Sequence, residues 1–224
     1  MTASSAEREA APNTEPVRKT QPPHADIVIA TGNAKKLREL ADLLRPSGLI
    51  AGAQREWNVS DADETGLTFV ENAILKARHA AAATGLPAIA DDSGLEVDAL
   101  GGQPGVFSAR FAGAHGDDDA NNRLLLERLA GVPKNARQAR YRCVMVALRH
   151  AEDPSPLITE GTWEGRIATA PGGHEGFGYD PLFIVEEYGV TAAELPFSVK
   201  QRLSHRGRAV RALVQALPGF IARR

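Results

Sequence analysis

Residues 87–94 (Pro-Ala-Ile-Ala-Asp-Asp-Ser-Gly) constrain the fold of this chain more than any other segment. Their apolar run, preceded by Gly-Leu and followed by Ser-Gly, predicts a buried strand that runs into a tight turn. Asp91 and Asp92 at the end of such a strand need a cation or a hydrogen-bond network to hold them. Strand ends are where open α/β sheets place their chemistry, so the pair is a candidate reaction centre. A solvated Asp-Ser-Gly turn is the alternative.

The pattern of apolar residues predicts an α/β fold in which helices and strands mix without strict alternation. Residues 26–30 are predicted as a strand, followed by a turn and a helix that ends near Pro46. A second helix begins near Thr68, which opens a capping-box pattern, and runs to Gly85. Further strands are predicted at residues 95–99, 140–149, 157–169 and 182–185, and further helices at 117–130 and 204–217. We therefore expect a mixed, strongly twisted sheet flanked by helices.

The composition indicates one soluble domain behind an N-terminal tail. The chain has 224 residues, of which 43% are apolar and 24% charged, as in ordinary globular proteins. Residues 1–25 contain four prolines and one large aliphatic residue, Val17. Such a segment cannot bury enough surface to offset its ordering entropy, so we expect a disordered tail. The remaining residues, 26–224, are predicted to form a single domain.

Charge and cysteine content limit the possible partners and compartment. The formal net charge is −2, so no overall field attracts nucleic acid or an anionic membrane. No apolar run is long enough to cross a membrane, and the N-terminus lacks the apolar core of a secretory signal. The single cysteine, Cys143, lies in an apolar run and excludes an internal disulfide. We expect a cytoplasmic protein that binds neither nucleic acid nor membrane.

Three segments in the first half carry candidate anion- and metal-binding groups. Residues 31–36 (Thr-Gly-Asn-Ala-Lys-Lys) lie between a strand and a helix, where backbone N–H groups favour phosphate, although Asn33 also suits a plain N-cap. Glu64 could join Asp91 or Asp92 as an oxygen ligand of Mg²⁺, or belong to a solvated acidic turn. Lys76 shares a helix face with Thr68 and could add positive charge to an anion site.

Two segments in the second half are suited to binding a flat ligand. Residues 172–181 form a glycine-rich loop in which Phe177 and Tyr179 could stack on a base; a structural hairpin would look similar. Lys200, His205 and Arg206 lie at or near the start of the last helix and offer hydrogen-bond donors. A basic start is unfavourable against the helix dipole, which favours a functional reason for the arginine.

These segments, in this order, resemble the inosine/xanthosine triphosphate pyrophosphatases, enzymes that remove deaminated purine nucleotides from the precursor pool. The matching residues are 30–36, 64–78, 90–95, 101–110, 176–181 and 204–207. Each motif alone is weak, but the ordered set is specific and spans nearly all of residues 26–217. The N-terminal 25 residues fall outside the resemblance.

The resemblance implies an Mg²⁺-dependent hydrolase of acid anhydride bonds that converts ITP, dITP or XTP to the monophosphate and pyrophosphate. It also implies a homodimer, and an active site in a cleft between two lobes around a long sheet. Asp92 would be the catalytic carboxylate, and Glu64, Asp92 and Asp91 would hold the metal. The implied substrate contacts are Thr31, Gly32, Asn33, Ala34, Lys35, Lys36, Lys76, Ser93, Phe177, Gly178, Tyr179, Asp180, Lys200, His205 and Arg206. The division of roles between Asp91 and Asp92 stays open.

Base selection has a simple physical logic. Hypoxanthine and xanthine carry a 6-keto acceptor where adenine carries a 6-amino donor. Donors from His205, Arg206 or loop N–H groups would hydrogen-bond to the 6-keto oxygen, whereas the 6-amino group of adenine would face them donor against donor. The sequence identifies neither the group that excludes the guanine 2-amino group nor a preference for ribose or deoxyribose. The alternatives are a pyrophosphatase for other modified nucleotides and a non-catalytic nucleotide-binding protein.

Overall fold

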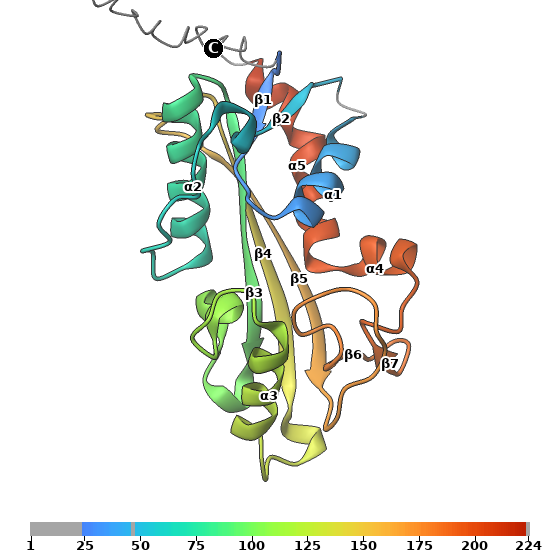
Figure 1. Cartoon of the computed structure of the whole chain (residues 1–224). Coiled ribbons are helices and arrows are strands. Elements are labelled where there is room, and N and C mark those ends of the chain that lie inside the picture. Colours follow the sequence, from blue (N-terminus) through green and yellow to red (C-terminus); the bar gives the residue numbers. More distant parts are fainter. Residues whose placement is uncertain (1–23, 46–47, 223–224) are drawn as a thin grey trace, which may run out of the picture.

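A seven-stranded mixed sheet organises the molecule (Figure 1). The structure is a computed structural model that describes residues 24–45 and 48–222. The strands, in the order β2-β1-β3-β4-β5-β6-β7, are β2 (Ala51–Ala53), β1 (Ile27–Ile29), β3 (Ala88–Val97), β4 (Gln138–Leu148), β5 (Leu157–Ile167), β6 (Phe183–Val185) and β7 (Val190–Thr191). β1 pairs in parallel with β2 and β3, and all the other pairings are antiparallel. The expected mixed sheet flanked by helices is confirmed.

Two groups of helices cover opposite faces of β3 and β4. α1 (Ala34–Leu44) and α5 (His205–Ile221) pack on one face, where Ile89 and Cys143 are buried. α2 (Phe69–Thr84) packs on the other face, against Ala90 and Val144. Because neighbouring side chains on a strand point to opposite faces, each long strand contributes to both cores.

A third apolar cluster lies toward the far end of the long strands. It joins α3 (Asp118–Arg128) to β3, β4, β5 and β6, in the lower part of Figure 1. Its largest side chains are Leu95, Leu125, Tyr141, Trp163 and Phe183. Helices α1, α2 and α5 thus lie at one end of the long sheet and α3 at the other, with the middle of β3 between them.

The tight turn predicted after Asp92 is wrong. β3 continues through Ser93 and Gly94 to Val97, paired with β4 along its whole length, so the strand predicted at 95–99 is its continuation. A Cβ on Gly94 would meet the Gly105 carbonyl and the Ser108 side chain. The glycine therefore permits close packing of the 3₁₀ helix η4 (Gly105–Arg110) on the strand, and does not mark a turn.

The helix boundaries follow the local signals in the sequence. Thr68 caps α2 in a capping box, and the Ser204 side chain caps α5 by accepting from the Gly207 N–H. β2, β7 and the short α4 (Phe197–Leu203) were not predicted. Residues 1–23 of the expected tail lie outside the described residues. Among residues 24–45 and 48–222, no helix is long and apolar enough to cross a membrane.

Candidate active site

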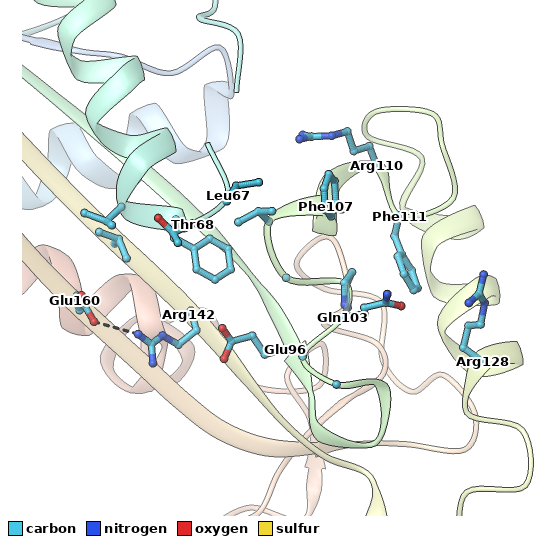
Figure 2. Close-up of a pocket in the computed structure, with 18 residues that line it drawn as sticks. Leu67, Thr68, Glu96, Gln103, Phe107, Arg110, Phe111, Arg128, Arg142 and Glu160 are labelled. Atoms are coloured by element: carbon cyan, nitrogen blue, oxygen red, sulfur yellow. Dashed lines mark hydrogen bonds and ion pairs between the residues drawn. The ribbon is translucent and has the colours of Figure 1, made fainter. Parts of the chain in front are cut away.

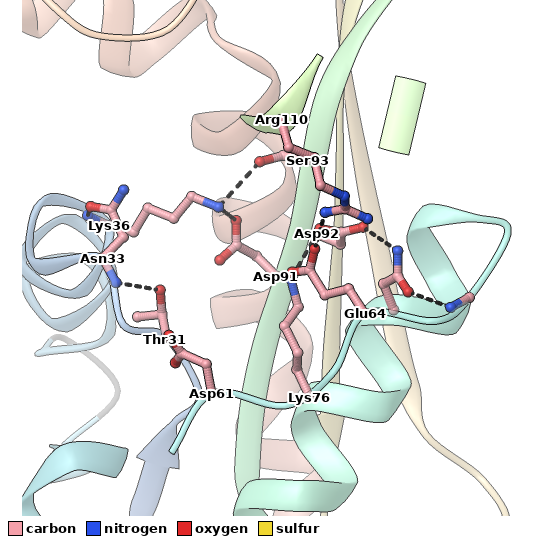
Figure 3. Close-up of polar contacts among 12 residues, drawn as sticks. Thr31, Asn33, Lys36, Asp61, Glu64, Lys76, Asp91, Asp92, Ser93 and Arg110 are labelled. Carbon is pink, nitrogen blue, oxygen red and sulfur yellow. Dashed lines mark hydrogen bonds and ion pairs between the residues drawn. The ribbon is translucent and has the colours of Figure 1, made fainter. Parts of the chain in front are cut away.

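The α1/α5 face of β3 holds Asp91 between two cations, of which Figure 3 shows Lys36. Lys36 Nζ, from α1, lies 3.0 Å from Asp91 Oδ2, and Arg206 Nη2, from α5, lies 3.6 Å from the same oxygen. The two cations also donate to Ser93 Oγ, at 3.4 Å and 3.1 Å, because Ser93 lies two residues further along the same face. Asp91, Ser93, Lys36 and Arg206 thus form one connected network.

These cations fix the charge of Asp91. Its side chain is only 1% exposed, and burial alone would raise its pKa. The positive charges of Lys36 and Arg206 outweigh burial and hold the pKa of Asp91 well below its ordinary value. Asp91 is therefore a permanent carboxylate at neutral pH and a weak base.

The α2 face of β3 holds Asp92 in a different environment. Lys76 Nζ donates to Glu64 Oε1 at 2.8 Å and to Asp92 Oδ1 at 3.0 Å, so one ammonium group joins the two carboxylates. The buried amide of Asn72 donates to Asp92 Oδ2 at 3.2 Å. The structure thus brings Glu64, Lys76 and Asp92 together although they are widely separated in the sequence.

The pKa of Asp92 on this face is shifted upward, whereas the pKa of Asp91 on the α1/α5 face is shifted downward. Burial raises the pKa of Asp92; Lys76 counteracts this, and the negative charges of Glu64 and Asp91 add to it, so its pKa lies above the ordinary value. Burial would also raise the pKa of Glu64, but Lys76 and Arg110 outweigh it and lower that pKa. Asp92 is the better proton acceptor of the adjacent pair.

Arg110 is a site residue that the sequence did not identify. It ends η4, and its Nη1 lies 3.2 Å from Glu64 Oε2. Its guanidinium also lies 5.2 Å from the centre of the Phe107 ring. The only signal was its place in the 101–110 segment of the family resemblance, which did not indicate that η4 folds back onto β3 beside Glu64.

The β1–α1 loop leads into the N-terminus of α1, the helix that carries Lys36. Asn33 Oδ1 accepts from the Lys36 N–H at 3.2 Å, as an N-cap does, and Thr31 Oγ1 accepts from the Asn33 N–H. A Cβ on Gly32 would collide with the Asp61 carboxylate. Ala34 and Lys35 begin α1, but their side chains lie outside the described part of the structure.

A second cluster of side chains surrounds Phe177, and Arg206 joins this cluster to the network around Asp91. Lys200 Nζ and Arg206 Cζ lie 5.4 Å and 5.6 Å from the centre of the Phe177 ring. Asp180 is buried; it accepts from Lys200 Nζ and from the Phe177 N–H. Gly178 is fixed by hydrogen bonds to α3, donating to Asp118 and accepting from the Asn122 amide.

Two aromatic side chains in this cluster have structural partners. Tyr179 is buried and its hydroxyl donates to the Ser108 carbonyl at 2.8 Å, so it joins the glycine-rich loop to η4. The buried ring of His205 stacks on Tyr141 with centres 4.6 Å apart and planes 10° apart. Burial, together with the nearby charge of Arg206, lowers the pKa of His205 well below its ordinary value, so the imidazole is neutral.

The oxygen donors fit a nucleotide-bound metal better than a protein-only metal site. In the described ranges, no cluster of three or more His, Cys, Asp or Glu side chains is arranged to hold a metal. Glu64 and Asp92 nevertheless converge on one cation, the Lys76 ammonium. Mg²⁺ bound with nucleotide commonly uses one or two carboxylates together with phosphate oxygens and water. The pair Glu64 and Asp92 suits that chemistry.

A groove of about 800 Å³ opens on the α2 face beyond the carboxylates (Figure 2). Arg110 lines it on one side, and the Arg142–Glu160 ion pair lies on another. Two large apolar side chains there are exposed, Leu67 at 85% and Phe107 at 54%. The groove contains neither Asp92 nor Glu64, so it is a neighbouring feature and not the carboxylate centre itself.

Comparison with known proteins places this architecture in one family. The Ham1 family model matches residues 27–216. A dITP/XTP pyrophosphatase of Thioalkalivibrio sulfidiphilus is 60% identical over 193 residues, which cover 86% of this chain and 98% of that protein. The dITP/XTP pyrophosphatase of Escherichia coli K12 is 57% identical over 191 residues, which cover 85% and 97%.

Solved structures agree with the sequence comparisons. A HAM1 protein from Coxiella burnetii superposes with a TM-score of 0.83 at 47% identity, covering 88% of this chain and all of that one. A protein from Mycobacterium abscessus, described as nucleoside-triphosphatase / dITP/XTP pyrophosphatase, gives a TM-score of 0.70 at 44% identity, covering 84% and 97%. In sequence, in fold and over nearly its whole folded length, the chain belongs to the Ham1 family.

Proposed function

We propose that this protein hydrolyses deaminated purine nucleoside triphosphates (ITP, dITP and XTP) to the nucleoside monophosphate and pyrophosphate. The observation that carries the proposal is the set of relatives named dITP/XTP pyrophosphatase, which match nearly end to end at 57–60% identity. The carboxylate and cation networks on β3 are the chemistry that such a reaction needs. They offer a base, groups to neutralise phosphate charge and a place for a metal.

Asp92 is the proposed base. Attack of water on the α-phosphorus requires a group that takes up a proton from the water, and efficiency rises as the pKa of that group approaches the working pH. The pKa of Asp92 is raised, whereas that of Asp91 is depressed by Lys36 and Arg206. Asp91 would instead hold these two cations and Ser93 in place for the substrate.

Mg²⁺ is the proposed cofactor, held by Glu64 and Asp92. When bound, it supplies positive charge that stabilises the phosphate oxygens. Lys36, together with the N–H groups at the start of α1, would bind phosphate from the other side of the strand. Lys76, which joins Glu64 and Asp92 here, lies where it can also approach the phosphate chain.

The cluster around Phe177 is the proposed base pocket. The Phe177 ring offers a stacking surface, and Arg206 joins the pocket to Ser93. The neutral imidazole of His205 can present an N–H to a 6-keto oxygen without bringing a second buried charge. Adenine, with a 6-amino donor at that position, would leave buried donors without a partner.

The proposal includes a cytoplasmic homodimer that binds no nucleic acid. Leu67 and Phe107 are exposed apolar side chains beside the groove on the α2 face, the kind of surface that protein interfaces bury. A molecular mass in solution twice that of the chain, lost on Leu67→Glu with Phe107→Glu, is the expected result. A wild-type monomer would contradict this part.

Pyrophosphate release from a panel of triphosphates tests the function. ITP and XTP should turn over far faster than ATP, GTP or pyrimidine triphosphates, and only with Mg²⁺. Equal rates for all substrates would favour an enzyme with another specificity. Binding without turnover would favour a nucleotide-binding protein.

A further inference from the structure

Asn72 is a fully buried polar side chain that the proposed mechanism does not use. It lies in the first turn of α2, with 0% of its surface exposed. Its amide spans two parts of the site, since Nδ2 donates to Asp92 Oδ2 at 3.2 Å and Oδ1 accepts from the Gly66 N–H at 2.8 Å. Buried amides are costly unless satisfied, so these two contacts are the ones this side chain is built to make.

The backbone fixes which way the amide points. A backbone N–H can only donate, so the Gly66 N–H must face the oxygen end of Asn72. The NH₂ end is then forced toward Asp92, whose Oδ2 must accept. The other oxygen, Oδ1, is left facing Lys76. The carboxylate of Asp92 is therefore held at both oxygens, in one orientation.

Gly66 makes this arrangement possible. A Cβ at this position would lie 2.8 Å from Asn72 Oδ1 and 2.6 Å from Glu71 Cβ. Only a glycine lets the chain that carries Glu64, two residues earlier, lie directly on α2. The capping box at Thr68 fixes the start of α2 independently, so Asn72 is presented from a rigid turn.

We propose that Asn72 is a positioning residue that holds the Asp92 carboxylate in its reactive orientation and ties it to the loop that carries Glu64. This inference rests on the proposed function. The single amide of Asn72 then aligns two carboxylates that come from different elements. Removing such a supporting contact typically lowers activity by about 10- to 100-fold without touching substrate.

Two substitutions separate positioning from simple structural support. Asn72→Ala removes both hydrogen bonds. Asn72→Asp keeps the shape and can still accept from the Gly66 N–H, but cannot donate to Asp92 as a carboxylate. If Asn72 positions Asp92, kcat for ITP falls by about 10- to 100-fold in both variants, and KM stays within about threefold. If Asn72 merely fastens the loop, Asn72→Asp keeps the wild-type kcat.

A control and a binding measurement complete the test. Asp153→Asn weakens another buried polar contact, with Arg149, in the β4–β5 connection; it should lower the melting temperature but leave kcat unchanged. Mn²⁺ affinity, measured by electron paramagnetic resonance with the α,β-methylene analogue of ITP, should weaken about tenfold in Asn72→Ala. Unchanged Mn²⁺ affinity would overturn the coupling to Glu64, and wild-type kcat in Asn72→Asp would overturn the positioning of Asp92. A wild-type protein that does not cleave ITP would overturn the proposed function itself, and this inference with it.

Discussion

The two faces of β3 treat adjacent carboxylates in opposite ways. On the α1/α5 face, Asp91 is paired with both Lys36 and Arg206 and its pKa is depressed. On the α2 face, Asp92 shares one lysine with Glu64 and its pKa is raised. A strand sends neighbouring side chains to opposite sides, so two identical residues one position apart can take different roles. Asp91 holds two cations in place, and Asp92 remains able to accept a proton.

Asp92→Asn is the substitution with the largest expected effect on activity. An amide cannot accept the proton of water, so turnover of ITP should fall by about 10³-fold or more while the circular dichroism spectrum is unchanged. The melting temperature of the metal-free protein should fall less than in Asp91→Asn, because burial disfavours the ionised form of the carboxylate that is removed. Turnover within tenfold of wild type would remove the distinction between the two faces.

Asp91→Asn should instead reduce stability. It leaves Lys36 and Arg206, whose side chains are 18% and 8% exposed, without their carboxylate. Breaking a buried pair by removing one partner costs about 3–5 kcal/mol, which urea unfolding would detect. Asp92→Asn, unfolded in the same way, is the matched comparison. An unchanged urea midpoint for Asp91→Asn would contradict a structural role.

Arg206→Ala tests the link between Asp91, on the α1/α5 face, and the base pocket. Loss of this donor should reduce the ratio of kcat/KM for ITP to that for ATP by about tenfold, while the Mg²⁺ dependence is kept. Arg208→Ala is a suitable control, because Arg208 lies on the same helix but is exposed and donates to the Thr162 carbonyl. An equal change in both variants would show that selectivity does not come from Arg206.

Arg110→Ala should have a smaller effect on activity, confined to the carboxylate group on the α2 face, where Arg110 pairs with Glu64. The ion pair with Glu64 is partly exposed, so its loss should lower kcat/KM by only about threefold. Arg128 lines the same groove without contacting Glu64, and Arg128→Ala should match wild type. A larger loss with Arg128→Ala than with Arg110→Ala would show that the groove matters more than the contact with Glu64.

The smallest expected effect is on the pH dependence of the free energy of unfolding, which should change in opposite senses in the Asp91 and Asp92 variants. Asp91 has a depressed pKa in the folded state, so it contributes stability above its unfolded pKa of about 3.9 that is lost as the pH falls. Asp92 has a raised folded pKa, so its contribution changes in the opposite sense and falls as the pH rises. In the metal-free protein, Asp91→Asn should flatten the loss of stability on acidification below about pH 4, whereas Asp92→Asn should steepen the loss on acidification above about pH 4. Shifts of the same sign, measured by urea unfolding at several pH values, would contradict the assignment.

Local signals in the sequence predicted much of the fold. The capping box at Thr68 and the N-cap at Ser204 identified the starts of two helices, and the apolar runs identified β4 and β5. The turn after Asp92 was wrong because Ser-Gly favours turns locally, whereas Gly94 serves packing against η4. A tertiary contact therefore overrode a local preference.

The site was harder to predict because residues far apart in the sequence form it. Glu64, Lys76 and Asp92 could be named from sequence, but the lysine was expected at the phosphates, and its contacts join the two carboxylates. Arg110, 46 residues from Glu64, carried no local chemical signal of its own. The separate networks of Asp91 and Asp92 depend on β3 continuing as a strand past both residues, which the predicted turn excluded.

A single-turnover comparison of Asp91→Asn and Asp92→Asn tests the division between the two faces most directly. Each variant, folded at low temperature and saturated with ITP and Mg²⁺, would be followed by pyrophosphate release beside the wild-type protein. If Asp92 is the base and Asp91 organises the cations, Asp91→Asn releases pyrophosphate at least about tenfold faster than Asp92→Asn. A slower release by Asp91→Asn than by Asp92→Asn would contradict it.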